Sequence, residues 1–150
     1  MGVLDGPFRP FFLLSSFVAI AVPTVWVLSF AGLFEMENSF SSLMAWHAHE
    51  MIFGMGGALI AGFLLTASAH WSNKEAFTGS NLLILSVLWM QERAIFFFGE
   101  SGFLILISSI SFTLIFLIYL YIMLKDNKKN LLIIFSIMLL FALFKFLFLY

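Results

Sequence analysis

The sequence predicts an all-α protein, a polytopic transmembrane bundle of about five spanning helices, and three observations support this fold class. Hydrophobic residues make up 63% of the 150-residue chain, and charged residues only 10%. A soluble domain carries about a quarter charged residues. Long apolar stretches recur along the chain, and its basic residues are confined to alternate connecting segments. We therefore expect a lipid bilayer to surround most of the surface.

Five stretches are each close to the length of about 20 apolar residues that a membrane-spanning helix needs. The first follows Arg9 and is too long and too poor in cleavage signals for a secretory leader. The third is the shortest and most polar, and a Gly-rich turn separates it from the fourth. A Lys-rich loop divides the last two. We expect one membrane domain over 1–150, with helices at about 11–33, 46–69, 81–98, 102–124 and 131–150.

The positions of Lys and Arg predict the orientation of the bundle. Outside the predicted helices, basic residues occur in the N-terminal segment and in the second and fourth loops, and none occurs in the first and third loops. These residues are Arg9, Lys74, Lys125, Lys128 and Lys129. Because basic loops stay in the cytoplasm, the N-terminus is expected to be cytoplasmic.

The composition also excludes several classes of function. The chain has no Cys, so disulfides, thiolate metal sites and thiol chemistry are ruled out. Its net charge is −1 and it has no basic run, so no nucleic-acid partner is expected. His, Met and carboxylate side chains remain as metal ligands.

Seven polar residues fall inside the predicted helices, where ionisable groups are costly and are candidates for a functional site. The predicted topology places all of them near the external end of the bundle. We expect Glu50 to pair with Arg93, with Glu92 as the third member of a supporting polar cluster. A helix-dipole role for Glu50 and an interfacial role for Lys145 are the structural alternatives. The seven are His47, His49, Glu50, Gln91, Glu92, Arg93 and Lys145.

His47 and His49 are the candidate metal ligands. On a helix they lie about 200° apart, so they cannot both face one ion. His47 shares its face with Met51, Gly54 and Ala58, and a His above small residues is an arrangement that a haem ring would need. Imidazole and thioether groups also bind copper. The alternative is that the Met and small residues only pack against neighbouring helices.

Three blocks of the sequence are distinctive, and the W-H-A-H-E-M run in the second is the most specific. The blocks are Phe8-Arg9-Pro10-Phe11-Phe12, Trp46 to Gly54, and Ile60 to Ala67. Together with Trp71 and the 89–93 stretch, they resemble the N-terminal part of the NnrS family of polytopic membrane proteins. The resemblance implies haem or copper as cofactor, a role in the nitric oxide response and a place in the bacterial inner membrane. Family members are longer, which implies a further membrane chain that supplies the missing helices.

Two other functions remain open from the residues alone. One is a non-catalytic membrane module that packs against a partner protein, with the polar residues as an interhelical network. The other is a small transporter-like protein, although no charged residue lies near the predicted midplane, where transport sites are usual. Whether the chain is an enzyme does not follow from its residues.

Overall fold

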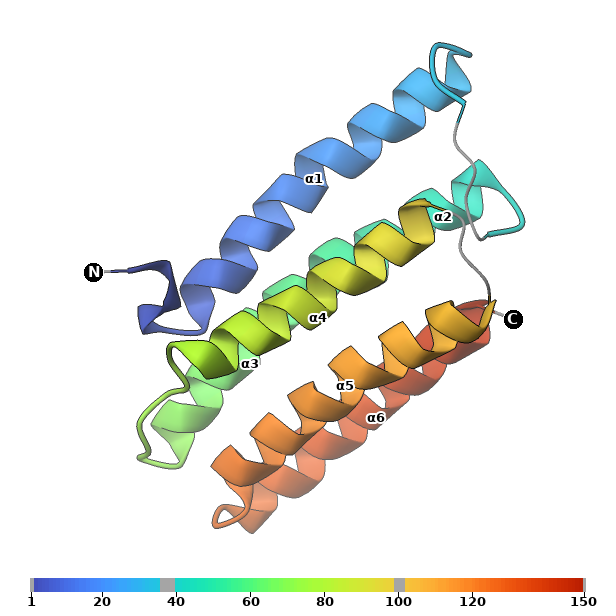
Figure 1. Ribbon diagram of the computed structural model, residues 1–150. Coiled ribbons are helices and arrows are strands. Elements are labelled where there is room, and N and C mark those ends of the chain that lie inside the picture. The colour runs from blue at the N-terminus through green and yellow to red at the C-terminus, as the bar shows by residue number, and fades with distance from the viewer. Residues whose placement is uncertain (1, 36–39, 99–101, 150) are drawn as a thin grey trace.

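The computed structural model describes residues 2–35, 40–98 and 102–149 and shows five helical rods running up and down (Figure 1). A short 3-10 turn, η1 (Val3–Asp5), precedes the first rod, α1 (Phe8–Phe30). The second rod is continuous and joins α2 (Leu43–His49), the π-helical η2 (Glu50–Gly56) and α3 (Gly57–Trp71). The others are α4 (Ser80–Phe97), α5 (Gly102–Leu124) and α6 (Lys128–Leu149).

The predicted helical membrane bundle is confirmed, with one difference in the number of spans. Within the described residues, four rods are long and apolar enough to cross a membrane: α1, the Leu43–Trp71 rod, α5 and α6. The predicted third span, α4, is not among them, because Gln91-Glu92-Arg93 in its last two turns make this 18-residue helix too polar. It nevertheless lies alongside the others and packs on α5.

Three helices begin three residues earlier than predicted; a tolerated proline explains the start of α1, and side-chain caps explain the starts of α2 and α6. In α1, Pro10 lies in the first turn, where backbone N–H groups have no intrahelical acceptor and proline is tolerated. The Ser42 hydroxyl accepts a hydrogen bond from the Ala45 backbone at 3.1 Å and starts α2. Asn127 caps α6 in the same way, through the Asn130 backbone N–H at 3.3 Å.

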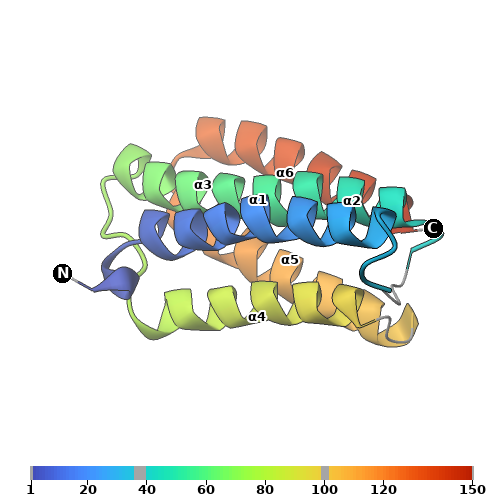
Figure 2. The same ribbon diagram turned by 90° about the horizontal axis from the view of Figure 1, so that it is seen from above.

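The rods pack around a core that α3 and α5 hold together. α1 packs on α3 and η2, α3 packs on α5, and α5 contacts both α4 and α6. Figure 2 shows α5 between α4 at one edge and α6 at the other. Leu65, Leu85 and Leu120 are completely buried, whereas large apolar side chains such as Phe17 and Leu132 are exposed on the outside. Lipid contact accounts for this apolar exterior.

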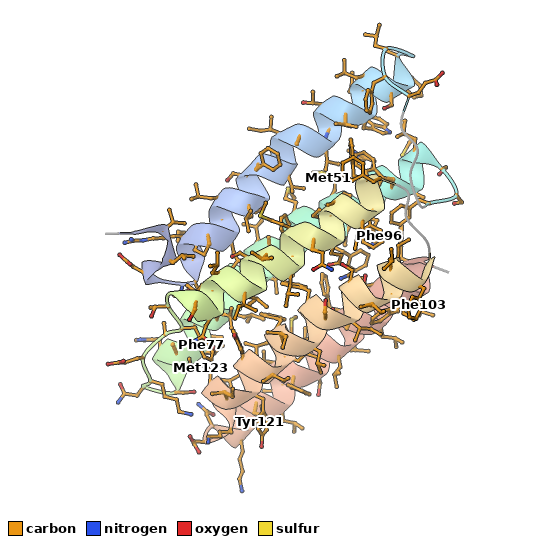
Figure 3. All side chains as sticks on the ribbon, viewed as in Figure 1. Met51, Phe77, Phe96, Phe103, Tyr121 and Met123 are labelled. Carbon is orange, nitrogen blue, oxygen red and sulfur yellow. The ribbon has the colours of Figure 1, made fainter. Side chains whose placement is uncertain are left out.

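All five basic loop residues lie at one end of the bundle, called here the basic end. The backbone of Gly79 donates to the Leu4 carbonyl, which joins the N-terminal segment to the α3–α4 loop. The Lys74 ammonium donates to the carbonyls of Ile122 and Met123 at 3.0 and 3.1 Å. It also pairs with Asp126 at 2.8 Å, so one lysine caps α5 and fixes the α5–α6 turn. Phe77, Tyr121 and Met123 mark this end in Figure 3.

Replacing Lys74 by methionine is expected to lower the free energy of unfolding by about 0.5–1 kcal/mol, because a cation is lost at a helix C-terminus. The hydrogen bond and positive charge of Lys74 lower the pKa of Asp126 below its ordinary value of 3.8. Their contribution is therefore present above pH 3.8 and is lost as the pH falls through the lower folded pKa. Melting in detergent should show this acid-dependent component in the parent protein and in a Lys129→Met control, but not in Lys74→Met.

Candidate functional site

Five of the seven polar residues predicted to lie in the membrane meet at the end of the bundle opposite the basic end. His49 and Glu50 come from the junction of α2 and η2, Glu92 and Arg93 from α4, and Lys145 from α6. We call these five, together with Ser109 of α5, the buried ion-pair network. Figure 3 marks this end by Met51 and Phe96. The network joins four rods that are far apart in sequence.

The predicted pair of Glu50 and Arg93 is present. The Nε atom of Arg93 lies 3.2 Å from Glu50 Oε2, and its Nη2 atom lies 3.0 Å from Glu92 Oε2. The other oxygen of Glu92 accepts a hydrogen bond from the Ser109 hydroxyl at 2.6 Å and also pairs with the Lys145 ammonium. Two carboxylates therefore face two cations.

The side chains of the network are almost completely buried. His49 is 0% exposed, Glu92 1%, Glu50 2% and Lys145 4%. Aromatic rings close the space around it: the Arg93 guanidinium lies 5.5 Å from the Trp89 ring and 5.4 Å from the Phe96 ring. Charges in such a place are tolerated only because each has a partner of opposite sign.

Gly54 makes room for this arrangement. A Cβ atom at this position would lie 2.9 Å from Arg93 Nη1 and 3.0 Å from Glu50 Oε2. The residue lies in η2, whose wider turns add backbone bulges that are frequent at functional sites. Because Gly54 has no side chain, the guanidinium of Arg93 can lie against the backbone of the second rod and contact Glu50.

The role of Ser109 and the burial of Lys145 could not be predicted from the sequence. Ser109 is one of several serines in α5, and nothing in its spacing distinguishes it from Ser108 or Ser111. Lys145 was a candidate, but an interfacial position was the alternative; its burial and its pair with Glu92 place it inside the bundle. Gln91, the residue before Glu92, is exposed and does not join the network.

The structure separates His47 from His49, as their helical spacing predicts. The His47 ring stacks on Trp26 of α1, with centroids 4.6 Å apart. The residues predicted to share its face lie in protein contacts: Met51 packs against the core, and Ala58 is 0% exposed. Gly54 faces Arg93, whereas Gly62 faces Phe11 and Phe12 of α1. Side chains of this chain therefore cover the surface that a haem ring would need.

His47 and His49 nevertheless each have a buried ring nitrogen without a partner among the described residues. The Nδ1 atom of His47 and the Nε2 atom of His49 are buried and have no hydrogen-bond partner among the described residues. The Nδ1 atom of His49 lies 3.0 Å from Glu50 Oε1. Since a carboxylate only accepts, Nδ1 carries the proton in this contact; in the neutral ring Nε2 then carries the lone pair, the arrangement usual for metal-ligating histidines.

A complete metal site is not assembled within the part of the chain that the structure describes. No group of three or more His, Asp or Glu side chains there could hold an ion. Aromatic rings also surround His49, with Phe96 and Phe53 at centroid distances of 4.7 and 5.1 Å. The donors present fit a single imidazole ligand at each histidine, and further ligands would have to come from elsewhere.

Comparison with known proteins identifies the family. Neither the curated proteins nor the solved structures give a match. The family model described as NnrS protein matches residues 2–150. This range includes every helix and the whole ion-pair network, so the chain belongs to the NnrS family.

Proposed function

We propose that this protein acts in the nitric oxide response of the bacterial inner membrane and holds haem or copper through His49 or His47. Membership of the NnrS family supports the response, and the apolar rods support the membrane. The basic end would face the cytoplasm, because basic loops are retained there. The ion-pair network would then lie toward the outer side.

The observation that carries the cofactor proposal is the geometry of His49. Glu50 accepts from its Nδ1–H at 3.0 Å, and its Nε2 lone pair has no partner in the described chain. A carboxylate behind a histidine fixes the ring orientation and strengthens the nitrogen as a ligand. Arg93 in turn holds Glu50 in place. A bound haem iron or copper ion would supply a coordination position for a diatomic gas.

The test is an absorption spectrum and a metal assay of the protein purified in mild detergent. The parent protein should show a Soret band that shifts with nitric oxide, or stoichiometric copper. The content should fall by at least tenfold in His49→Ala or in His47→Ala, since removal even of a group that orients a ligand lowers metal affinity by about 10- to 100-fold.

His70→Ala is the matched control, because His70 is exposed near the far end of the same rod. It should retain the full cofactor content. Circular dichroism must show that each variant is folded. Unchanged haem and copper content in the His47→Ala, His49→Ala double variant would rule out both histidines as ligands.

A second candidate function is a non-catalytic membrane module that packs against a partner protein. The ion pairs favour this function, because every charged side chain of the network has its partner inside this chain. These side chains are Glu50, Glu92, Arg93 and Lys145. In that case the protein would be free of cofactor, and Arg93→Leu would abolish assembly with the partner.

A further inference from the structure

An apolar groove runs between α1 and α4 and reaches the ion-pair network at its base. Its volume is about 310 Å³, and its walls include Val18 and Val22 of α1 and Phe97 of α4. Glu50 and Arg93 also line it. The volume lies at the lower limit for pockets that hold small organic ligands, roughly 300–1,000 Å³.

Two buried side chains at the groove have hydrogen-bond donors that lack acceptors among the described residues. Trp46 lines the groove and is 2% exposed, and its indole Nε1–H has no partner in the described chain. The three guanidinium nitrogens of Arg93 are also buried without a hydrogen-bond acceptor among the described residues; Nε and Nη2 form ion pairs with Glu50 and Glu92, and Nη1 forms none. A buried donor without a partner is costly and rare, so an acceptor brought by a ligand would remove a penalty at both residues.

The charge balance of the network selects a neutral acceptor. Glu50 and Glu92 already neutralise Arg93 and Lys145. An anionic ligand would add an uncompensated negative charge in a buried place, which is strongly unfavourable. A carbonyl oxygen accepts from Trp46 and Arg93 without adding charge.

The walls of the groove select a ligand that dissolves in the membrane. α1 and α4 make few contacts with each other, and the groove opens on the side of the bundle between them. Phe17 and Phe98, at 68% and 69% exposed, are among its lining residues. A flat ring can pack against the exposed aromatic side chains Phe17 and Phe98, and an apolar tail can lie along the valines.

We infer that the α1–α4 groove binds a membrane-soluble quinone, with one carbonyl oxygen accepting hydrogen bonds from Trp46 and Arg93. Among membrane-soluble carbonyl compounds, quinones combine a neutral head, a planar ring and an apolar tail. Fatty acids and phospholipids carry charge next to their carbonyl groups. The binding requires neither haem nor copper, so it can be tested whatever the outcome of the cofactor experiment.

The test uses the protein in nanodiscs with a photoreactive azido derivative of a short-chain ubiquinone as probe. Labelling should saturate, map to peptides of α1 and α4, and be competed by decylubiquinone. Trp46→Phe removes one neutral hydrogen bond and should weaken the apparent affinity about threefold to tenfold. Ala94→Phe fills the groove from α4 and should abolish saturable labelling.

Two control variants keep the test specific. Leu83→Phe adds a ring to an exposed site on α4 outside the groove. Trp71→Phe makes the same substitution as Trp46→Phe, but near the basic end. Both should label like the parent. If Ala94→Phe does not fold, Ala21→Phe fills the groove from α1.

Two results would overturn the inference. One is labelling that does not saturate, spreads over the lipid-facing residues, or persists when the groove is filled. The other is displacement of the probe by palmitate at lower concentrations than by decylubiquinone, which would show that the groove prefers an anion.

Discussion

Arg93→Leu is expected to lower the free energy of unfolding by about 3–5 kcal/mol, the range for breaking a buried ion pair by removing one partner. The arginine contacts Glu50 and Glu92 through different nitrogens, at 3.2 and 3.0 Å. Its loss leaves two buried carboxylates with only Lys145 as a counter-charge, and that lysine pairs with Glu92. Glu50 is left without a cation at 2% exposure.

Denaturation in mixed detergent micelles measures this effect. Lys129→Leu removes one positive charge from an exposed position at the basic end and should change stability by less than about 0.5 kcal/mol. The double variant Arg93→Leu, Glu50→Gln restores the charge balance and should recover much of the loss. If Arg93→Leu melted like Lys129→Leu, the ion pairs would contribute little to the fold.

The pairing of Glu50 with Arg93 could be predicted because it depends only on topology. The alternation of basic loops placed the start of the second rod and the end of α4 at the same end of the bundle. Ionised groups at one depth in an apolar bundle must then find partners. Glu92 and Lys145 could be placed at this end in the same way, although topology does not determine whether the lysine faces the interior.

The local register of the second rod could not be predicted in the same way. A uniform α-helix places His47, Gly54, Ala58 and Gly62 on one face. The π-helical turns of η2 have more residues per turn, so they change the direction in which the residues after them point. Gly54 then meets α4 and Gly62 meets α1. No residue type marks a π-helix, because tertiary contacts rather than local propensity select it. Residues that the sequence places on one helical face therefore pack against two different helices.

The position of the two histidines also depends on a boundary that the sequence left uncertain. The prediction began the second helix at Trp46 and placed His47 and His49 in its first turn. Capping by Ser42 moves the start to Leu43, so the histidines lie one turn deeper. His49 is completely buried there, and its ring lies among aromatic rings. A ligand that reaches it must pass into the bundle.

Gly62→Ala is expected to lower the free energy of unfolding by about 1–3 kcal/mol, the range for overpacking. A Cβ atom on Gly62 would lie 2.9 Å from the Cβ of Phe11 and 3.3 Å from the Phe12 ring. The Phe11 Cβ is fixed to the α1 backbone, so a rotamer change cannot relieve the contact. The helices must move apart, and helix pairs in membranes depend on such close approach.

Gly57→Ala is the matched control for Gly62→Ala, because both glycines are buried in α3 and receive the same methyl group. At Gly57 the added Cβ would meet only the Phe141 ring, at 4.0 Å, which is ordinary van der Waals contact. This variant should be neutral or more stable by up to about 1 kcal/mol, since alanine favours the helix. Equal melting of the two variants would show that α1 does not depend on Gly62 for its contact with α3. A loss confined to Gly62→Ala would show that the close approach of α1 to α3 at this glycine stabilises the bundle.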